Sequence, residues 1–330
     1  MKKIIAIAFA DLHLHSFPAF AKDKYDRFKI RLKVLDLIVK KGIKNNCPIL
    51  FAGDLFHDPK ELSNYIITET QTYFGYRFNS FNEENQEFIC ISGNHDQSEK
   101  NTRDNKSPTY LGGLHKVFDK VKLIDNKYYT HKGINYFGIP YLNDEDYFFE
   151  KVKEFNKVAA GLGKSILLIH RDLPNCKTPA GFMFKEIPGF PKNPDKLFSN
   201  FNLVLSGHIH RPTILSSKLV MLGAPIHQDS GDVGCKMGYW EIYEDFSMKL
   251  ITLNHLFPNF VKLTPGEEPY NDKDYFIQPE LEELEDESIT EFSNKSSNKA
   301  LVKKYLKRKG IKSMRKKKLL VELLNQGKND

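Results

Sequence analysis

The sequence predicts an α/β fold of four layers, in which two facing mixed sheets are flanked by helices and a short C-terminal extension follows. Short apolar runs alternate with amphipathic stretches over the first half of the chain, and the later part is rich in runs typical of strands. A length of 330 residues is enough to bury a large core. We therefore expect one large domain with an appendage rather than several equal domains.

The first half of the chain has the pattern β-α-β-α-β. The expected elements are strand 2–10, helix 25–41, strand 48–53, a helix near 60–75 and strand 87–92. The helical pattern at 25–41 places Phe28, Leu32, Leu35 and Val39 on one face, as a helix packed on a sheet requires. Crossovers of this length favour parallel pairing of the strands.

The second half begins after a glycine-rich loop and becomes richer in strands. The expected elements are strand 134–140, a helix near 143–160, strands 164–170 and 201–207, and three β-rich runs at 217–225, 237–245 and 246–254. The three last runs follow one another closely, so we expect hairpins there rather than crossovers.

The positive charge of the chain is concentrated at its end. Residues 293–330 hold 13 Lys or Arg against Glu322 and Asp330, a local charge of +11 in a chain of net charge +7, so the rest carries −4. An acidic and polar stretch at 281–299 has the composition of a linker. Within the basic tail at 300–330, the pattern at 300–324 predicts two short amphipathic helices separated at Gly310.

Composition and cysteine spacing indicate a cytoplasmic protein that does not enter a membrane. The longest apolar runs are far shorter than a membrane span, and the N-terminal run lacks a cleavage site and reads as a strand. The four cysteines, Cys47, Cys90, Cys176 and Cys235, are far apart, which indicates free thiols in a reducing compartment.

Side chains able to bind metals follow nearly every expected strand. They are Asp11, His13 and His15, then Asp54, His57 and Asp58, then Asn94, His95 and Asp96, then His170, and finally His208 and His210. A single cluster of this kind more often forms a turn, but turns alone do not explain such clusters at five successive strand ends. The carboxyl ends of parallel strands share one crevice, so we expect these side chains to lie around one pocket. The neighbouring Gly53, Gly93 and Gly207 indicate close backbone approach.

This set of side chains predicts two divalent cations and phosphate ester hydrolysis. Imidazole, carboxylate and amide ligands together suit Mn²⁺, Fe²⁺ or Zn²⁺, and the number of candidates favours two ions rather than one. Two ions bridged by a carboxylate generate hydroxide and clamp the oxygens of an in-line displacement at phosphorus. The sequence has no nucleophile elbow or dinucleotide motif in a matching context, so no nucleotide cofactor is expected.

The order D-x-H, G-D, G-N-H-D, H and G-H-x-H over about 200 residues resembles the calcineurin-like metallophosphoesterases. Within that superfamily, "GDLFHDP", "FGIPY", "SGHIHRP" and "LGAPIHQDSGDVGCKMGYWEI" resemble the SbcD-type nucleases of DNA repair, including versions encoded by bacteriophages. The resemblance covers about 1–255, which we expect to be the phosphoesterase domain. Residues 256–280 would then be a reduced capping segment, 281–299 the linker and 300–330 the basic tail.

The resemblance implies a role for each motif residue. It assigns Asp11, His13 and His210 to one metal, Asn94, His170 and His208 to the second, and Asp54 to the bridge between them. His95 would protonate the leaving oxygen, and Asp96 would hold its ring. Mn²⁺ is the expected metal, with Mg²⁺, Fe²⁺ or Zn²⁺ as alternatives.

Some residues fall outside the family pattern. The family usually has Gly where this chain has His15, which could contact the substrate phosphate at the rim of the pocket. Arg171 could also contact substrate, and His227 lies in a stretch that could flank the site.

We therefore expect a two-metal DNA nuclease, exo- or endonucleolytic, in a repair and recombination complex with an SbcC-type ATPase. Its partners would be DNA, that ATPase and a second copy of the chain. The basic tail fits either DNA or the ATPase. Two alternatives stay open, namely a small-molecule or nucleotide phosphodiesterase or phosphatase, and a scaffold subunit that bridges DNA and the ATPase.

Overall fold

The computed structural model describes residues 2–17, 21, 23–58, 62–78, 87–98, 109–179, 181–263, 267 and 274–277. The chain divides into two compact units, one of residues 1–261 with 269–277 and one of 262–268 with 278–330. The predicted linker and basic tail at 281–299 and 300–330 lie outside the described residues. Both six-stranded sheets belong to the first unit.

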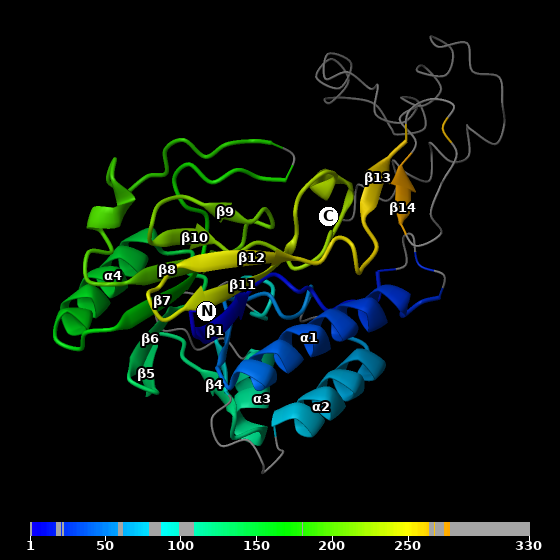
Figure 1. The fold of residues 1–330 in the computed structure, drawn as a ribbon, viewed down its shortest axis with the longest axis horizontal. Helices are drawn as coiled ribbons and strands as arrows, with labels where there is room; N and C mark the ends of the chain where they lie inside the picture. Colours follow the sequence, from blue (N-terminus) through cyan, green and yellow to red (C-terminus); the bar gives the residue numbers. More distant parts are fainter. Residues whose placement is uncertain are drawn as a thin grey trace, which may run out of the picture. The chain divides into compact units, whose positions relative to one another are not determined.

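The first sheet is mixed and has six strands (Figure 1). In spatial order they are β12 (Met248–Thr252), β11 (Gly238–Tyr243), β1 (Ile4–Phe9), β2 (Ile49–Phe51), β3 (Phe88–Cys90) and β4 (Val121–Leu123). Strands β1 to β4 run parallel, whereas β11 and β12 add an antiparallel edge. The hairpin expected at the end of the domain is the pair β11 and β12.

The second sheet is also mixed and six-stranded. Its strands in order are β5 (Lys127–His131), β6 (Ile134–Ile139), β7 (Ser165–His170), β8 (Leu203–Gly207), β10 (Leu219–Met221) and β9 (Thr213–Ile214). Strands β6, β7, β8 and β10 run parallel, and the edge strands β5 and β9 are antiparallel to their neighbours. A small third sheet pairs β13 (Phe260–Lys262) with β14 (Tyr275–Ile277).

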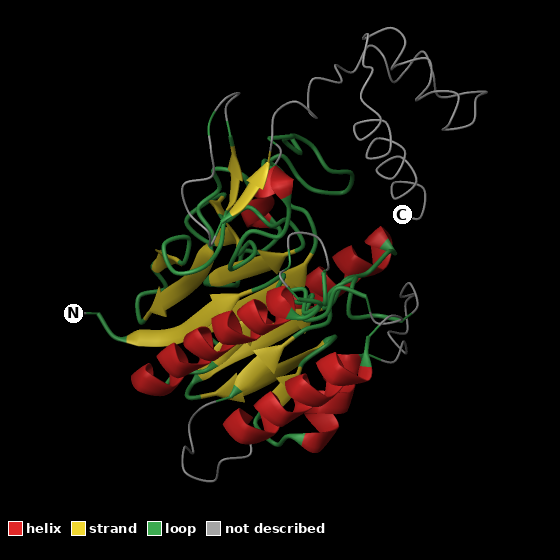
Figure 2. Cartoon of the chain, turned by 90° about the vertical axis from the view of Figure 1, so that its right-hand side faces the viewer, coloured by secondary structure: helices red, strands yellow, loops and turns green. Residues whose placement is uncertain are grey.

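Helices flank the two sheets (Figure 2). They are α1 (Asp26–Asn45), α2 (Asn64–Phe78), α3 (Tyr110–Val117) and α4 (Glu145–Ala160), with two short 3₁₀ turns at Pro194–Lys196 and Ser230–Asp232. Helices α1, α2 and α3 pack on the first sheet and α4 packs on the second. The predicted four-layer α/β sandwich is therefore confirmed.

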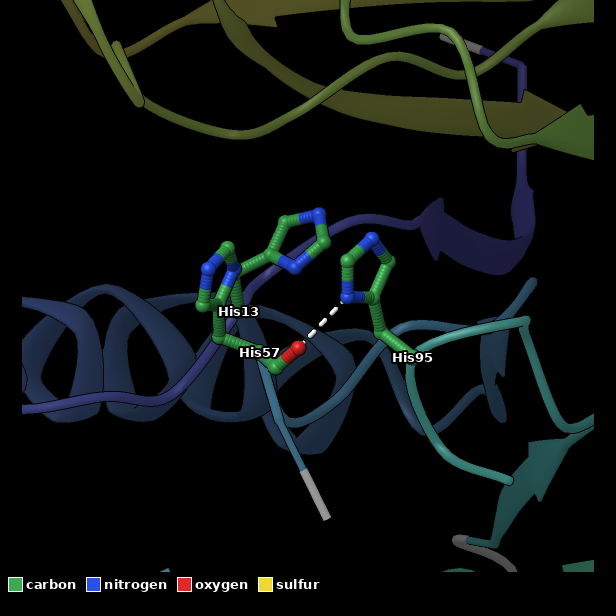
Figure 3. Close-up of side chains that lie close together, drawn as sticks. All are labelled: His13, His57 and His95. Carbon is green, nitrogen blue, oxygen red and sulfur yellow. Dashed lines mark hydrogen bonds between the residues drawn. The ribbon is translucent and has the colours of Figure 1, made fainter. Parts of the chain in front are cut away.

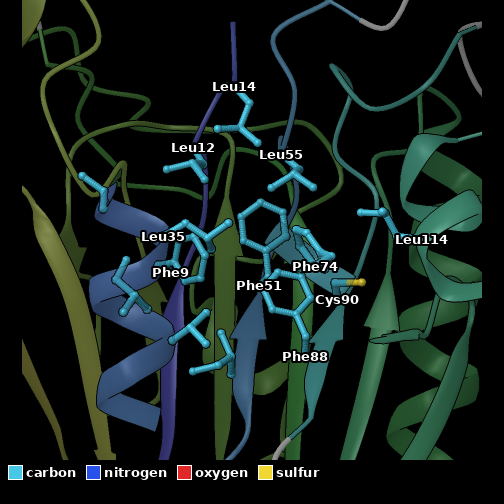
Figure 4. Close-up of a cluster of buried hydrophobic side chains, with 14 of the residues drawn as sticks. Phe9, Leu12, Leu14, Leu35, Phe51, Leu55, Phe74, Phe88, Cys90 and Leu114 are labelled. Atoms are coloured by element: carbon cyan, nitrogen blue, oxygen red, sulfur yellow. The ribbon is translucent and has the colours of Figure 1, made fainter. Parts of the chain in front are cut away.

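The alternation of side chains along β1 explains why the sheets form separate layers. Ile7 and Phe9 point into the core shared with α1 and α2, drawn in Figure 4, whereas Ala6 and Ala8 point into the core between the two sheets. A third core lies between the second sheet and α4, around Phe148. A strand buried on both faces reads as a continuous apolar run, as seen at the N-terminus.

The structure departs from the sequence prediction in the middle of the chain. The glycine-rich segment expected to be a loop contains α3, whose N-terminus is capped by the Thr109 hydroxyl accepting a hydrogen bond from the Gly112 backbone at 3.0 Å. Burial of Leu111 and Leu114 outweighs the low helix propensity of the two glycines. Strands β4 and β5 were not predicted, because one has three residues and the other is largely exposed.

Two compositional predictions can be compared with the described residues. All four cysteines are free and buried, as expected. Within the described part of the chain, no helix has both the length and the apolar character needed to cross a membrane.

Truncation of Phe51 tests the packing of the first sheet. Its ring is fully buried, with centroids 4.9 Å from Phe9 and 5.6 Å from Phe88. We expect Phe51→Ala to lower the free energy of unfolding by about 3 to 5 kcal/mol, measured by denaturant titration. Phe182→Ala, at a side chain that is 65% exposed, should change it by no more than about 0.5 kcal/mol. Equal effects of the two substitutions would contradict the packing described.

Candidate metal centre

The carboxyl ends of strands from both sheets meet at one place. The first sheet contributes the segments following β1, β2 and β3, and the second contributes the last residue of β7 and the segment following β8. The residues that they bring together are Asp11, His13, Asp54, Asn94, His95, His170, His208 and His210. The predicted crevice is thus built between two sheets rather than at the edge of one.

Four of these residues have left-handed backbone. The φ angle is 53° at Asp11, 49° at His13, 62° at Asp54 and 89° at His208. Such conformations cost about 1 to 3 kcal/mol each in residues other than glycine and persist only where the surroundings fix them. Here the Asp11 N–H donates to the Gly53 carbonyl and the His13 N–H to the Asp54 carbonyl, both at 3.0 Å. The loops after β1 and β2 therefore hold each other in place.

The carboxylate of Asp54 lies between two groups of imidazoles. Its Oδ1 accepts the backbone N–H of His95 at 2.8 Å, while Oδ2 lies 3.7 Å from His13 Nε2 and 3.3 Å from His170 Nε2. The His13 and His210 rings approach to 3.2 Å between their Nε2 atoms, and Asp11 groups with this pair. This geometry suits a carboxylate shared by two ions.

The second group of ligand atoms centres on Asn94. Its Oδ1 lies 3.0 Å from both His170 Nε2 and His208 Nδ1. The backbone N–H of His208 donates to the Asp11 carboxylate at 3.0 Å, which joins the two groups. The contacts of Asn94 with His170 and His208 match one ligand set that the resemblance implies, whereas Asp11 lies within reach of Asp54 and His170 as well as of His13 and His210. The assignment of ions to the two sets stays a prediction.

The hydrogen-bonding pattern fits bound cations. The Nδ1 of His170 donates to the Ala52 carbonyl at 2.6 Å, so the neutral ring presents a lone pair at Nε2. That lone pair faces Asp54 Oδ2 and Asn94 Oδ1, two acceptors that have no proton to offer. Only a proton on the ring or a cation between these atoms removes the repulsion.

Burial makes this charge distribution costly without a counter-ion. It raises the pKa of Asp11 to about 8 and lowers the pKa of His13 well below its ordinary value and that of His208 to about 4. Burial opposes ionisation of Asp54 as well, yet without a metal ion the protonated ring of His170 holds the pKa of that carboxyl well below its usual range. Burial lowers the pKa of His170, but the Asp54 carboxylate outweighs it and raises that pKa to about 9, so a cation would take the place of this proton. The residues present therefore fit two divalent cations, which would neutralise the buried carboxylates and use the neutral imidazoles as ligands.

Glycines beside the ligands allow the strand ends to approach, as the sequence predicts. A Cβ atom on Gly93 would lie 2.0 Å from Oδ1 of Asp54, and one on Gly207 would lie 2.3 Å from the Ala52 carbonyl oxygen. Glycine at position 93 is therefore the only residue type compatible with the observed position of the Asp54 carboxylate.

The ring of His95 is held differently from what the resemblance implies. Its Nδ1 donates to the carbonyl oxygen of His57, as Figure 3 shows beside the ring of His13. The Asp96 carboxylate instead accepts backbone N–H groups of Gly93 and of 54–56, at 2.7 to 3.3 Å. The expected pairing of Asp96 with His95 is thus wrong, because the Asp96 carboxylate binds the backbone of the loop that carries Asp54.

The residues predicted to contact substrate lie outside the two ligand groups. The Nδ1 of His15 accepts the Phe17 backbone N–H at 3.1 Å, and its ring centroid is 5.2 Å from that of His57. The Arg171 guanidinium lies over the ring of Phe148 on α4, 4.2 Å from its centroid. His15 therefore borders the site on the His57 side, whereas Arg171 packs against a helix. Substrate contact by either remains a prediction.

A buried arginine and glutamine support the first ligand loop and were missed in the sequence. Arg31 Nε donates to the Leu12 carbonyl at 3.2 Å, and its Nη2 donates to Gln228 Oε1 at 2.6 Å. Gln228 Nε2 in turn donates to the Asp11 carbonyl at 3.2 Å. The sequence drew attention to the adjacent His227, whose ring is bonded to Cys235 and Phe260 instead.

The sequence of residues 6–212 matches the family described as calcineurin-like phosphoesterase. The chain belongs to this family. Calcineurin-like phosphoesterases use a dinuclear metal site, in agreement with the two ligand groups around Asp54. No curated protein matches the sequence of this calcineurin-like phosphoesterase.

Two solved structures are similar to this phosphoesterase. A putative 5'-nucleotidase from Staphylococcus aureus, in complex with alpha-ketoglutarate, is 14% identical, with a TM-score of 0.42 over 75% of this chain and 52% of that chain. The nuclease MPE from Pseudomonas putida is 15% identical, with a TM-score of 0.29 over 66% of each chain. The chain thus spans about half the length of the nucleotidase chain.

Substitution of Gly93 tests the link between strand packing and metal binding. We expect Mn²⁺ to raise the melting temperature of metal-stripped protein, because binding to the folded state alone stabilises it by about 2.7 kcal/mol at 100 times Kd. Gly93→Ala should abolish this rise, since the new Cβ displaces the Asp54 carboxylate. Gly113→Ala, on α3 with no atom within 4 Å of the added Cβ, should retain it. A normal Mn²⁺ response in Gly93→Ala would contradict the geometry.

Proposed function

We propose that this calcineurin-like phosphoesterase is a nuclease that hydrolyses DNA phosphodiesters with two divalent cations. The observation that carries the proposal is the Asp54 carboxylate between two imidazole groups, with His95 beside them. Asp11, His13 and His210 would hold one cation, and Asn94, His170 and His208 the other. DNA as the substrate is supported by the resemblance of the motifs to SbcD-type nucleases.

Bound at this site, two cations supply Lewis-acid polarisation of the phosphate oxygens and activation of water for attack on phosphorus. The protein contributes the positions of the ligand atoms. Asp11 and His13 are fixed by the hydrogen bonds to the loop after β2, so their ligand atoms need little reorganisation on binding.

His95 is the residue suited to move a proton. Its Nδ1–H is committed to the His57 carbonyl, so a proton can be exchanged with substrate only at Nε2. His95 would therefore donate from Nε2 to the departing oxygen, a step typically worth 10² to 10⁴ in rate.

Metal identity and partners are part of the same proposal. Mn²⁺ suits a mixture of nitrogen and oxygen ligands. An SbcC-type ATPase, a second copy of the chain and a role in DNA repair and recombination are supported by the sequence resemblance. The basic tail at 300–330 would bind either DNA or the ATPase.

A nucleotide or small-molecule phosphodiesterase is the second candidate. A cavity of about 390 Å³ adjoins His57 and His95, a size within the range of small-molecule sites. Such a substrate would use the same metal centre and the same proton donor.

The decisive assay uses purified protein with Mn²⁺ and three substrates. These are labelled single-stranded DNA, labelled double-stranded DNA and bis-p-nitrophenyl phosphate. We expect DNA cleavage, and we expect His95→Asn to reduce turnover by 10² to 10⁴ while retaining the Mn²⁺ effect on melting temperature. His255→Asn, at an exposed histidine, is the matched control.

Two results would contradict the proposal. Hydrolysis of the small diester without any cleavage of DNA, even with the ATPase and ATP present, would favour the second candidate. Unchanged turnover in His95→Asn would remove the role of His95 as the proton donor.

A further inference from the structure

A cavity beside the metal centre has a wall that the chemistry at phosphorus does not use. It has a volume of about 390 Å³, and the rings of His13, His57, His95 and His210 form part of its lining. A wall made of Phe17, Arg27, Phe260 and Ile277 completes the lining, and the Phe17 ring lies against that of His57, with centroids 4.7 Å apart. A ligand in the cavity would therefore lie next to the leaving oxygen that His95 would protonate.

The wall is built around the guanidinium of Arg27, which is held flat among aromatic rings. Its Cζ lies 4.8 Å from the ring centroid of Phe17, 5.5 Å from that of Phe260 and 5.3 Å from that of Tyr275. Its Nη2 donates to the Gln228 carbonyl at 2.5 Å. Arg27 is only 4% exposed, so these contacts hold its guanidinium in place without a ligand.

A second arginine, Arg31, contacts the same wall. The Arg31 Cζ lies 4.7 Å from the Phe17 ring centroid, and Arg31 also donates to the Arg27 carbonyl at 3.3 Å. Phe17 thus lies against two cations and belongs to the network that supports the loop carrying Asp11. Asp229 also lines the cavity and is exposed; its carboxylate, which accepts the Gly231 backbone N–H at 2.7 Å, is a further acceptor for N–H groups.

We propose that this cavity binds the base of one unpaired nucleotide on the leaving side of the scissile phosphate. The inference rests on the proposed phosphodiesterase function and specifies its substrate. Aromatic rings and guanidinium planes stack on bases of any sequence, and the adjacent carboxylate can accept from an N–H group of the base, such as the ring N–H of thymine. The leaving side is indicated by His95, which lines the cavity and would protonate the leaving oxygen.

The size of the cavity sets the form of the substrate. A volume of about 390 Å³ is within the range of small-molecule sites and suits one nucleoside unit rather than a base pair within a duplex. A nucleotide bound here must therefore be unstacked from its partner strand. Single-stranded DNA and frayed ends are then preferred over internal positions of a duplex.

The test compares dithymidine monophosphate with two versions in which one nucleotide, on the 5' or the 3' side, is abasic. Hydrolysis is followed with Mn²⁺ for the wild type and for Phe17→Leu. In the wild type, we expect removal of the base on one side to raise KM by about tenfold or more. In Phe17→Leu, intact dithymidine monophosphate should show a similar rise, and removal of that base should then have little further effect.

Two further variants make the comparison specific. Phe17→Tyr retains a ring and should restore the dependence on the base. Phe182→Leu changes a phenylalanine that is 65% exposed and lies outside the cavity lining, and it should behave as the wild type.

Two outcomes would overturn the inference, and they are distinguishable. If both abasic substrates are hydrolysed with wild-type KM while bis-p-nitrophenyl phosphate is also hydrolysed, the base is not bound here and the proposed function stands. If none of these diesters is hydrolysed, the proposed function fails and the inference fails with it.

Discussion

The arrangement of the site depends on one buried carboxylate, that of Asp54. Its two oxygens contact residues from three strand ends: Oδ1 accepts the His95 N–H, and Oδ2 faces His13 and His170. Since His170 is the last residue of β7 in the second sheet, this single group links the two layers. Neighbouring features serve the same end, because Asp96 binds the Asp54 backbone N–H and Gly93 leaves room for Oδ1.

The buried charges and strained backbone of this site destabilise the folded state, and packing in the rest of the molecule compensates for this cost. Buried carboxylates and left-handed residues are unfavourable, yet they sit at the ends of strands whose interiors are packed on both faces. The rigid sheets and the Arg31–Gln228 pair hold the loops in position before any ion arrives. Cations bound there would neutralise the buried charge, so the same ions would stabilise the fold and support the reaction.

The sequence predicted what depends on local pattern. Apolar runs revealed the buried strands, and recurring Asp, His and Asn revealed that their ends converge. It could not reveal α3, since tertiary burial of Leu111 overrides two glycines. It also missed Gln228, 217 residues away from the carbonyl of Asp11 that it binds, and it paired Asp96 with the wrong partner. Contacts between distant loops leave no periodic signal in one sequence.

The central claim is that Asp54 is shared by two cations, and anomalous diffraction from crystals of the Mn²⁺-loaded protein tests it most directly. The account predicts two anomalous peaks on either side of the Asp54 carboxylate, about 3.5 to 4 Å apart, as in other two-metal sites. One ion would contact His13 and His210, and the other His170 and His208. A single peak, or peaks bound by His15 and His57 and away from Asp54, would contradict the account.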